Sequence, residues 1–575
     1  MTLVNPPESI GYNIRRNGEI SHRRFANTLD YSLDLIKIRE TYEKVFRNKR
    51  FSFIRGRKEY TQQVINVKFS YSYKLFNKAG NNTYIRAGYT YKDMDFEDCV
   101  CVRDGLLLGI QTGVQMQQSI DEQLLEECFV VDGDHYTQKG SIPCLLSKAE
   151  LRKYLYGNGF TCDGIHYVRF KRSSGSSRVG KCLFINEKLY AAIHKWDLCG
   201  LRIHDGDPID LAGFESYISL PTSSIIDTLE IFPENFLLID DYESVFEEDA
   251  VVVEYENDTL TAMAAPTTIC NSIFDGQSLM DVSLFSKYPT RGMLLLRNRF
   301  FKSACFNTNI QQWFEDHGIT RIEQLNGQTR ATSLQDIKII TTPSSIKYLK
   351  FGSFNRWLDH LDPVFGIVKH EKETHYFDGR MVQCHYQLLN TLQLTEGNVR
   401  DLLRPAFDYI TKVREDPDVL RYHIKYPTTP VEMSPMTNKN EIVYKLLGIN
   451  NDFAKTQWYL DFRKDLIRSL LKKLKQGHLY INGNYSTLLG NPMEMLQQSI
   501  GTFKGKTTMG VGNIHSKRFS YGETILGSRS PHICAGNVLL AQNIEHAGID
   551  RYFNLSNEVV CINSINENIQ QRLNG

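Results

Sequence analysis

The sequence predicts an α+β, multidomain fold, and three observations support this. The chain has 575 residues, and about 150 residues per domain suggests three or four domains. Hydrophobic residues make up 41% of the chain and charged residues 23%, a balance typical of a globular protein with a sizeable core. Patterns typical of strands and of helices follow one another in long blocks, first mixed, then β-rich, then helical, then β-rich again.

The first block, residues 1–150, is expected to be a mixed α/β region, and the sequence assigns it no role. Apolar residues recur at helical spacing in DYSLDLIKIRETYEKVFRNKR and predict a helix within residues 1–60. Alternating patterns in VINVKFSYSYKLF and TYIRAGYTY predict strands within residues 61–100. Residues 78–82, KAGNN, lie between them and have the composition of a loop.

Changes in pattern divide the rest of the chain into four further regions. Residues 151–225 and 226–345 carry short apolar runs separated by Gly, Asp, Pro and Ser, which indicates mainly strands. Residues 346–476 are increasingly helical, and their clearest helix spans Asn451–Gln476, with a cap near Asn451 or Asp452 and an end at Gly477. Residues 477–575 return to short strands. No internal repeat is visible in the sequence.

The charge is balanced overall but unevenly distributed. The net charge is +1, whereas residues 1–60 hold 13 Lys or Arg against 7 Asp or Glu. Residues 227–258 hold 12 Asp or Glu and no Lys or Arg. The basic segment fits either a nucleic-acid contact or a solvated surface. Acidic outer segments such as 227–258 would allow an interior basic cleft within a nearly neutral protein.

Cysteine usage and the N-terminus favour a cytoplasmic protein. The 12 cysteines form no C-x-x-C pair and accompany no His/Cys cluster with zinc spacing, so reduced thiols are expected. The N-terminus, MTLVNPPESIGYNIRR, does not resemble a signal peptide. No apolar window approaches the roughly 18 residues of a membrane span, so no membrane partner is expected. The oligomeric state is not indicated.

The first chemical motif is a Ser/Gly turn between two apolar runs, VRFKRSSGSSRVGKCLFI. Its hydroxyls, backbone N–H groups and flanking cations suit a phosphate contact, and a charged surface hairpin has the same composition. Arg178 ends the Ser-rich turn and is the residue expected to meet nucleic acid. The other cations are Arg169, Lys171, Arg172 and Lys181.

The second motif spans Phe274–Asn307 and combines an Asp-Gly turn with a strand rich in cations. Asp275 stands in the turn FDGQSL, and LLRNRFFKSACF carries Arg297, Arg299 and Lys302. On one continuous strand, Arg297 and Arg299 would share a face and Lys302 would lie on the other, unless a turn intervenes. A lysine on a strand is a compact charge that suits a nucleotide's phosphates, and an ordinary hairpin fits the same pattern.

Two further motifs lie near the end of the chain. The segment SRSPHICAGNV places Arg529 before a turn bracketed by Pro531 and Gly536, where the arginine can project toward a phosphate. The segment LSNEVVCINSINENIQQRLNG then runs as an apolar strand and a polar stretch to Gly575.

In this order, the four motifs resemble the two-barrel RNA polymerases. That superfamily includes the RNA-dependent RNA polymerases of eukaryotic RNA silencing and the single-chain RNA polymerases of some phages. The resemblance covers roughly residues 160–575. It implies a first double-psi β-barrel in 226–345, a helical insert, and a second, incomplete barrel in 477–575. SRSPHICAGNV is similar to the family's Arg-x-Pro … Pro-Gly-Asp turn, from which Ala535 and Asn537 depart.

The resemblance also implies an activity, the template-directed synthesis of RNA from NTPs. Such transfer is an in-line phosphoryl displacement, in which a lysine neutralises charge on the phosphates and carboxylates hold Mg²⁺. Lys302 corresponds to the family's catalytic lysine. VVCINSINENIQQRLNG matches the approach to the family's Mg²⁺-binding aspartate loop and stops where that loop should begin. We therefore expect no transfer by this chain alone, and activity once such a loop is appended.

Two other classes of function stay open at the level of sequence. A degenerate polymerase fold would bind nucleic acid through its basic segments without chemistry. Alternatively, Asp205, Asp207 and Asp210 in HDGDPIDL would hold a divalent ion in a metal-dependent nuclease, although Asp-Gly-Asp is also common in surface turns. The nuclease reading predicts that Asp207→Asn abolishes Mg²⁺-dependent cleavage and that Lys302→Ala matters less.

Overall fold

The structure is a computed structural model of the whole chain. It describes residues 31–68 and 156–574 nearly throughout, with gaps at 48, 56–57, 163, 173–180, 205, 257, 375–376, 378, 426–438 and 533, and it describes short strands elsewhere within 13–138. Two compact units emerge. The first comprises Met1–Pro233, Leu295–Ser303 and Ile346–Lys369, and the second Glu234–Leu294, Ala304–Ser345 and His370–Gly575.

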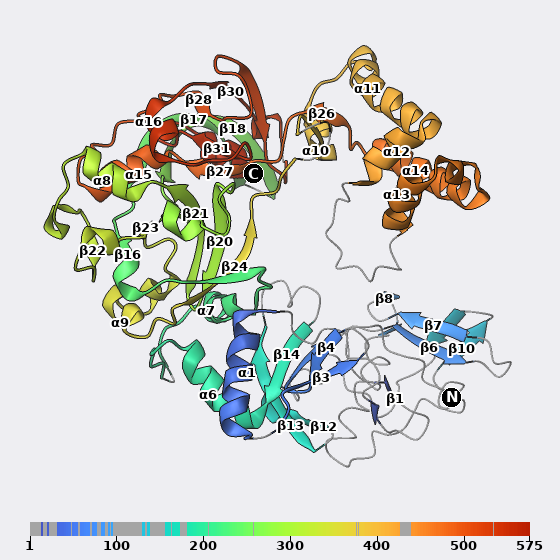
Figure 1. Cartoon of the computed structure of the whole chain (residues 1–575), viewed down its shortest axis with the longest axis horizontal. Helices are drawn as coiled ribbons and strands as arrows, with labels where there is room; N and C mark the ends of the chain where they lie inside the picture. Colours follow the sequence, from blue (N-terminus) through green and yellow to red (C-terminus); the bar gives the residue numbers. More distant parts are fainter. Residues whose placement is uncertain are drawn as a thin grey trace. The chain divides into compact units, whose positions relative to one another are not determined.

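A four-stranded antiparallel sheet with two helices lies in the first unit (Figure 1). Its strand order is β12-β13-β14-β5. The helix predicted within residues 1–60 is confirmed as α1, Leu33–Val45, whose N-terminus is capped by the Ser32 hydroxyl. Ile38 and Tyr42 of α1 share a buried core with Leu189 and Ile193 of α6. The bounds are β5 Val64–Lys68, β12 Phe160–Cys162, β13 Ile165–Lys171, β14 Lys181–Asn186 and α6 Glu187–Asp197.

Strands predicted within residues 61–100 are also confirmed. β6 and β7 pair antiparallel on either side of the expected loop. The short strands described between residues 13 and 138, apart from β5, form two-stranded pairs. They are β1 Asn13–Ile14, β2 Ile20–Ser21, β3 Ser52–Arg55, β4 Lys58–Thr61, β6 Ser72–Phe76, β7 Asn82–Arg86, β8 Thr90–Tyr91, β9 Met94–Asp95, β10 Phe129–Asp132 and β11 His135–Gln138.

The first of two strongly curled, half-barrel sheets has eight strands in the order β15-β24-β20-β21-β19-β23-β16-β22. The short helix α7 Leu211–Ile218 precedes the sheet in the chain, and α8 Ile310–Asp316 and α9 Phe354–Asp359 lie between its strands. Its strands are β15 Asp227–Glu230, β16 Phe236–Leu238, β19 Gln277–Asp281, β20 Met293–Asn298, β21 Phe301–Thr308, β22 Gln328–Thr329, β23 Ile339–Thr341 and β24 Val364–His370.

The second half-barrel sheet has five strands in the order β27-β31-β28-β30-β29. Its strands are accompanied by α15 Pro492–Ser499, α16 Ala547–Tyr552 and α17 Ile569–Asn574. They are β27 Thr487–Gly490, β28 Asn513–His515, β29 Thr524–Ser528, β30 Val538–Asn543 and β31 Val559–Ile562.

The two curled sheets repeat one topology. In the first sheet, β20-β21-β19-β23-β16 are neighbours, and in the second, β29-β30-β28-β31-β27 are neighbours. When the five strands of each set are numbered along the chain, both sets read third, fourth, second, fifth, first. The directions agree as well: fourth and second strands are parallel, second and fifth antiparallel, fifth and first parallel. The expected pair of related barrels is therefore present as strand order, although the sequence shows no repeat.

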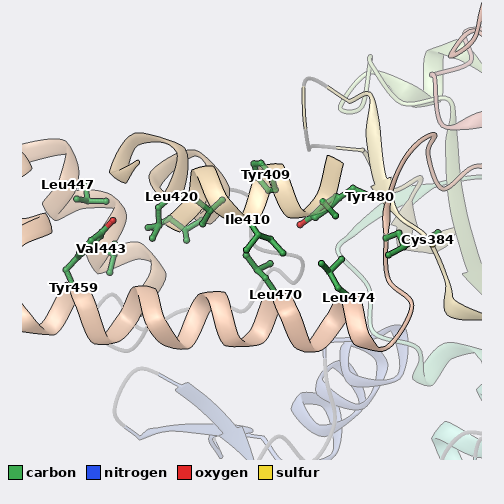
Figure 2. Close-up of a cluster of buried hydrophobic side chains, with 14 of the residues drawn as sticks. Cys384, Tyr409, Ile410, Leu420, Val443, Leu447, Tyr459, Leu470, Leu474 and Tyr480 are labelled. Carbon is green, nitrogen blue, oxygen red and sulfur yellow. The ribbon is translucent and has the colours of Figure 1, made fainter. Parts of the chain in front are cut away.

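Helices separate the two sheets along the chain, as predicted. Figure 2 shows their core, in which Leu470 lies beside Ile410, and Tyr459 lies near Val443 and Leu447. The short strands β25 Met381–Gln383 and β26 Tyr480–Asn482 pair at the ends of this segment. Its helices are α10 Tyr386–Thr391, α11 Glu396–Glu415, α12 Pro417–Lys425, α13 Lys439–Ile449 and α14 Gln457–Lys475.

The start of the last helix differs from the prediction. The sequence placed its cap near Asn451 or Asp452, but Asn451–Lys455 forms a separate 3₁₀ turn, and Thr456 caps α14 by accepting from the Tyr459 N–H. Asn450 caps the 3₁₀ turn in the same manner. Two capping residues six positions apart explain the difference, because each satisfies backbone donors of its own helical turn.

A long hairpin completes the second unit. β17, Glu243–Glu256, pairs antiparallel with β18, Thr259–Ser272, over all 14 residues of each strand. The pair forms a two-stranded sheet of its own. Asp258, in the two-residue turn between the strands, has a φ of 61°, a left-handed conformation that aspartate tolerates better than most residues.

Candidate functional site

Lys302 is the second residue of β21. It is exposed, while its neighbours Phe301 and Ser303 are buried, as the alternation of a strand requires. The ring of Phe301 stacks on Trp357 at 6.0 Å and meets Phe365 edge-on at 5.4 Å. The core thus fixes the start of β21 and directs the Lys302 side chain to the other face.

A tight turn joins β20 to β21, so LLRNRFFKSACF is two strands rather than one. Phe300 in this turn has a φ of 56°, which is uncommon for a bulky residue and persists only where packing enforces it. The buried Phe300 ring meets Tyr348 edge-on at 5.6 Å and lies 6.0 Å from Phe214 and from Phe351. An aromatic cluster therefore holds the turn that precedes Lys302.

Arg299 secures the same turn from within. It is 5% exposed, and its guanidinium donates to the carbonyls of Trp196 and His360 and lies 4.9 Å from the Trp196 ring centroid. Its own carbonyl accepts from the Trp357 indole. These contacts explain why an arginine occupies this position, since its planar fork satisfies two carbonyls at once.

Arg297 lies on β20 and has a different environment. Its Nε and Nη1 are buried and have no hydrogen-bond partner among the described residues. Burial lowers the pKa of its guanidinium to about 10. Because Arg299 stands in the turn and not on β20, the two arginines do not form the continuous strand face that the sequence pattern suggested. Buried donors without partners are rare and call for an explanation.

Asp275 lies in the turn just before β19 and is exposed. β19 runs parallel to β21, in register from the pair Gln277–Ala304 to the pair Asp281–Thr308. The Gly276 N–H donates to the Ser344 hydroxyl at 2.8 Å. Since parallel strands start at the same edge of a sheet, the Asp-Gly turn and the lysine strand begin at one edge.

The segment with Arg529 occupies the equivalent place in the second sheet. It joins β29 to β30, the third and fourth strands, just as the turn before Lys302 joins β20 to β21. Arg529 is exposed and donates to the Leu573 carbonyl at 3.3 Å. Asn537, where the family pattern has aspartate, is 6% exposed, accepts from the Cys534 N–H and donates to the Arg572 carbonyl. An asparagine suits this position because it satisfies a donor and an acceptor together.

The Ser/Gly turn with Arg178 lies outside the described residues, whereas some of its flanking cations are described. Lys171 is buried and donates to Asp34 at 2.7 Å and to Asp197 at 2.6 Å. Arg169 pairs with Glu215 and lies 4.7 Å from the Tyr156 ring centroid. These two cations therefore have carboxylate partners within the fold.

The aspartates of the nuclease alternative serve local structure where they are described. Asp210 caps α7 by accepting from the Ala212 and Gly213 N–H groups, and Asp207 accepts from the His204 N–H. Asp205 lies outside the described residues. Among the residues that the structure describes, no three or more His, Cys, Asp or Glu side chains are grouped to hold a metal ion.

Sequence reasoning missed one acidic side chain beside the second sheet. Glu494 on α15 is 1% exposed and accepts from the Asn491 amide at 2.7 Å and from the Thr508 N–H at 3.1 Å. Burial raises the pKa of its carboxyl to about 7, the range of a group that exchanges protons at neutral pH. The run GNPMEML carried no clear signal, because adjacent residues on a helix point in different directions and flanking methionines do not place the glutamate.

Comparisons with known proteins find a likeness in fold. No family model matches the chain, and no curated protein matches it. One solved structure that does match is the RNA dependent RNA polymerase QDE-1 from Thielavia terrestris, with 13% identity and a TM-score of 0.45. The match covers 74% of this chain and 44% of that one, so this chain spans less than half of its length. In the part of the chain that is described, no helix has the length and apolar character needed to cross a membrane.

Proposed function

We propose that this chain carries the basic side of a template-directed, RNA polymerase-like nucleotidyl-transfer site. One observation carries the proposal. Two curled sheets share one strand order, and both basic motifs include the connection between its third and fourth strands. Lys302 lies near the start of the fourth strand of the first sheet, and Arg529 directly follows the third strand of the second. A repeated scaffold that presents cations near this connection suits a reaction with charge on several phosphate oxygens.

The residues have distinct roles in this proposal. Lys302, on a strand start fixed by aromatic packing, neutralises charge that develops on an NTP's phosphates. Arg297 brings a guanidinium whose inner donors lack partners among the described residues, and a phosphate would satisfy an arginine of this kind. Arg178, Asp275 and Arg529 are proposed to contact template or nucleotide. Mg²⁺ is the metal that such transfer uses, and the described residues contain no group of three or more His, Cys, Asp or Glu side chains that could hold it.

A second candidate function is the binding of nucleic acid without chemistry. It is favoured by the lack of a grouped set of metal ligands among the described residues. The nuclease alternative is less favoured, because the Asp207 and Asp210 carboxylates already accept backbone hydrogen bonds, from the His204 N–H and the Ala212 N–H.

One experiment separates the three classes. The chain, both as it is and with a Gly-rich Asp-x-Asp-x-Asp loop appended after Gly575, is incubated with a single-stranded RNA template, labelled NTPs and Mg²⁺. The products are resolved on a denaturing gel, and RNA affinity is measured over a salt series. Template-dependent incorporation by the extended chain establishes the polymerase-like site, whereas incorporation by the unextended chain would contradict the expected need for the loop. RNA binding that weakens with salt, without incorporation by either form, assigns the chain to the binding class. Shortening of the template that disappears in Asp207→Asn establishes the nuclease. RNA affinity that is absent, or that does not respond to salt, would contradict the proposal.

A further inference from the structure

The β17–β18 hairpin is fixed at its base by hydrogen bonds to the loop after β31. Asn271, fully buried, donates to the carbonyls of Ser564 and Glu567 at 2.9 and 2.8 Å. The Ser244 hydroxyl accepts from the Asn566 N–H at 2.9 Å. These bonds anchor the strands where they leave the second unit, so the hairpin is a built feature and not a loosely attached loop.

Beyond this base, the hairpin exposes large apolar side chains. Residues i and i+2 of a strand share a face, so Val251, Val253 and Tyr255 form a row on one face of β17, and they are 72%, 59% and 67% exposed. Leu260 lies opposite Tyr255 in the register and is 69% exposed. Contiguous exposed apolar rows of this kind mark interaction surfaces.

The same hairpin is strongly acidic. Residues 243–272 contain seven Asp or Glu and no Lys or Arg. Glu247 and Asp249 continue the apolar row toward the base, and Glu254 lies on the opposite face, all three being exposed. A second copy of this hairpin or a nucleic acid would bring negative charge against these carboxylates. The charge therefore selects a cationic partner.

The open edge of β17 suggests how such a partner would bind. The described hairpin is a sheet of two strands, so each strand has an outer edge with no strand partner. Pro266 in β18 lacks an N–H donor, whereas β17 contains no proline. Natural edges are often protected by lysine or proline, and β17 has neither.

We propose that the outer edge of β17 is a docking site for an extended segment of a partner protein with alternating apolar and basic residues. Such a segment would add as a third strand through main-chain hydrogen bonds. Its apolar residues would lie beside Val251 and Val253, and its cations would lie beside Glu254 on the other face. None of Val251, Val253 and Glu254 is among the residues proposed for nucleotidyl transfer, so the two proposals fail independently.

Fluorescence anisotropy with synthetic peptides tests the proposal on the full chain. The probe is a labelled KVKVKVKV peptide, and the comparison peptides are EVEVEVEV and KKKKVVVV. We expect binding of the alternating basic peptide only, weaker at high salt. The double change Val251→Ser and Val253→Ser should lower affinity at least about tenfold, because two valines lose their apolar contact. The matched control is Ile449→Ser, an 81% exposed residue of α13, which should leave affinity unchanged.

A second variant keeps the test decisive if the serine changes disturb the hairpin. Glu254→Gln preserves shape and removes one charge, and it should weaken binding at low salt but not at high salt. Equal binding of EVEVEVEV would overturn the proposal, because it would show that positive charge is not required. Equal binding of KKKKVVVV would overturn it as well, because it would show that the alternation of apolar and basic residues is not required. So would sedimentation that shows a dimer lost in the double variant, or RNA binding lost in that variant, because a second copy or a nucleic acid would then be the occupant.

Discussion

Replacing Lys171 by methionine is expected to lower the free energy of unfolding of the first unit by about 3–5 kcal/mol at pH 8. Lys171, Asp34 and Asp197 are each at most 2% exposed, and the Lys171 ammonium joins both carboxyls. They come from β13, α1 and α6, so the ammonium ties the sheet to both helices. Without it, two acidic groups stay buried with no cation between them.

The pH dependence of this loss follows from the pKa shifts. Burial raises the pKa of Asp34, and it raises the pKa of Asp197 to about 8. One lysine balances one carboxylate, so the second carboxyl keeps a proton in the folded state that it loses in the unfolded state above about pH 4. The stability from that group is complete at low pH and declines as pH rises toward 8. Without the lysine both carboxyls must keep a proton in the folded state, so the stability of Lys171→Met falls more steeply as pH rises, and its cost should be smaller at pH 5 than at pH 8.

Urea unfolding followed by tryptophan fluorescence at pH 5 and pH 8 measures both effects. Lys195→Met, an exposed lysine on α6, is the matched control and should cost little. Asp197→Asn replaces the acid by a neutral group of similar shape and should flatten the dependence of stability on pH. Equal losses for Lys171→Met and Lys195→Met, or an unchanged slope in Asp197→Asn, would show that the three groups do not act as described.

The buried Lys171 also illustrates what the sequence does not reveal. In sequence it is one of five cations around a Ser/Gly turn, and that composition suggested a phosphate contact. Its carboxylate partners lie 137 and 26 residues away. Only the folded chain brings α1 and α6 onto the same sheet, so local pattern had no means of distinguishing a buried ion pair from a surface cation.

Local features were predicted more completely than long-range ones. The α1 helix followed from apolar spacing, and the helices between the two sheets followed from periodicity within about 20 residues. The repeated strand order was visible only through its motifs, because topology depends on which strands pair and not on their composition. The exposure of Val251 and Val253 was missed as well, since a valine-rich strand usually indicates burial.

The turn before Lys302 shows how the backbone conformation of one residue decides which side chains share a strand face. On one continuous strand, Arg297 and Arg299 would have shared a face unless a turn intervened. That turn is present, because Phe300 with its left-handed backbone divides LLRNRFFKSACF into two strands. That division separates Arg299 from Arg297 and places Lys302 at a strand start. The aromatic partners of Phe300 include Phe214, Tyr348 and Phe351, which lie far from it in sequence, so packing and not local propensity determines the turn.

In the chain extended by a Gly-rich Asp-x-Asp-x-Asp loop, replacing Lys302 by alanine is expected to reduce nucleotide transfer about 10²–10³-fold, the usual cost of removing one group that stabilises developing charge. Because incorporation and nucleotide contact are separable, the labelling of lysines by an acyl-phosphate derivative of ATP provides a second readout. Such a probe acylates lysines that lie against the phosphates, and mass spectrometry identifies the modified position. We expect Lys302 to be modified in the unaltered chain and excess ATP to suppress the modification.

Two further variants separate a phosphate contact from a general loss of charge or of folding. Lys369→Ala removes another exposed lysine, from β24 of the same sheet, and should leave incorporation and RNA affinity unchanged. Lys302→Arg keeps the charge and should retain more activity than the alanine variant, although not all of it, since a guanidinium meets phosphate with a different geometry. If Lys369→Ala lost as much incorporation as Lys302→Ala, or if Lys369 were labelled in place of Lys302, Lys302 would have no specific role in the site. Any exposed lysine on this sheet would then have the same effect. A loss confined to Lys302 would instead show that its place at the start of β21, held by Phe300 and Phe301, is what the chemistry requires.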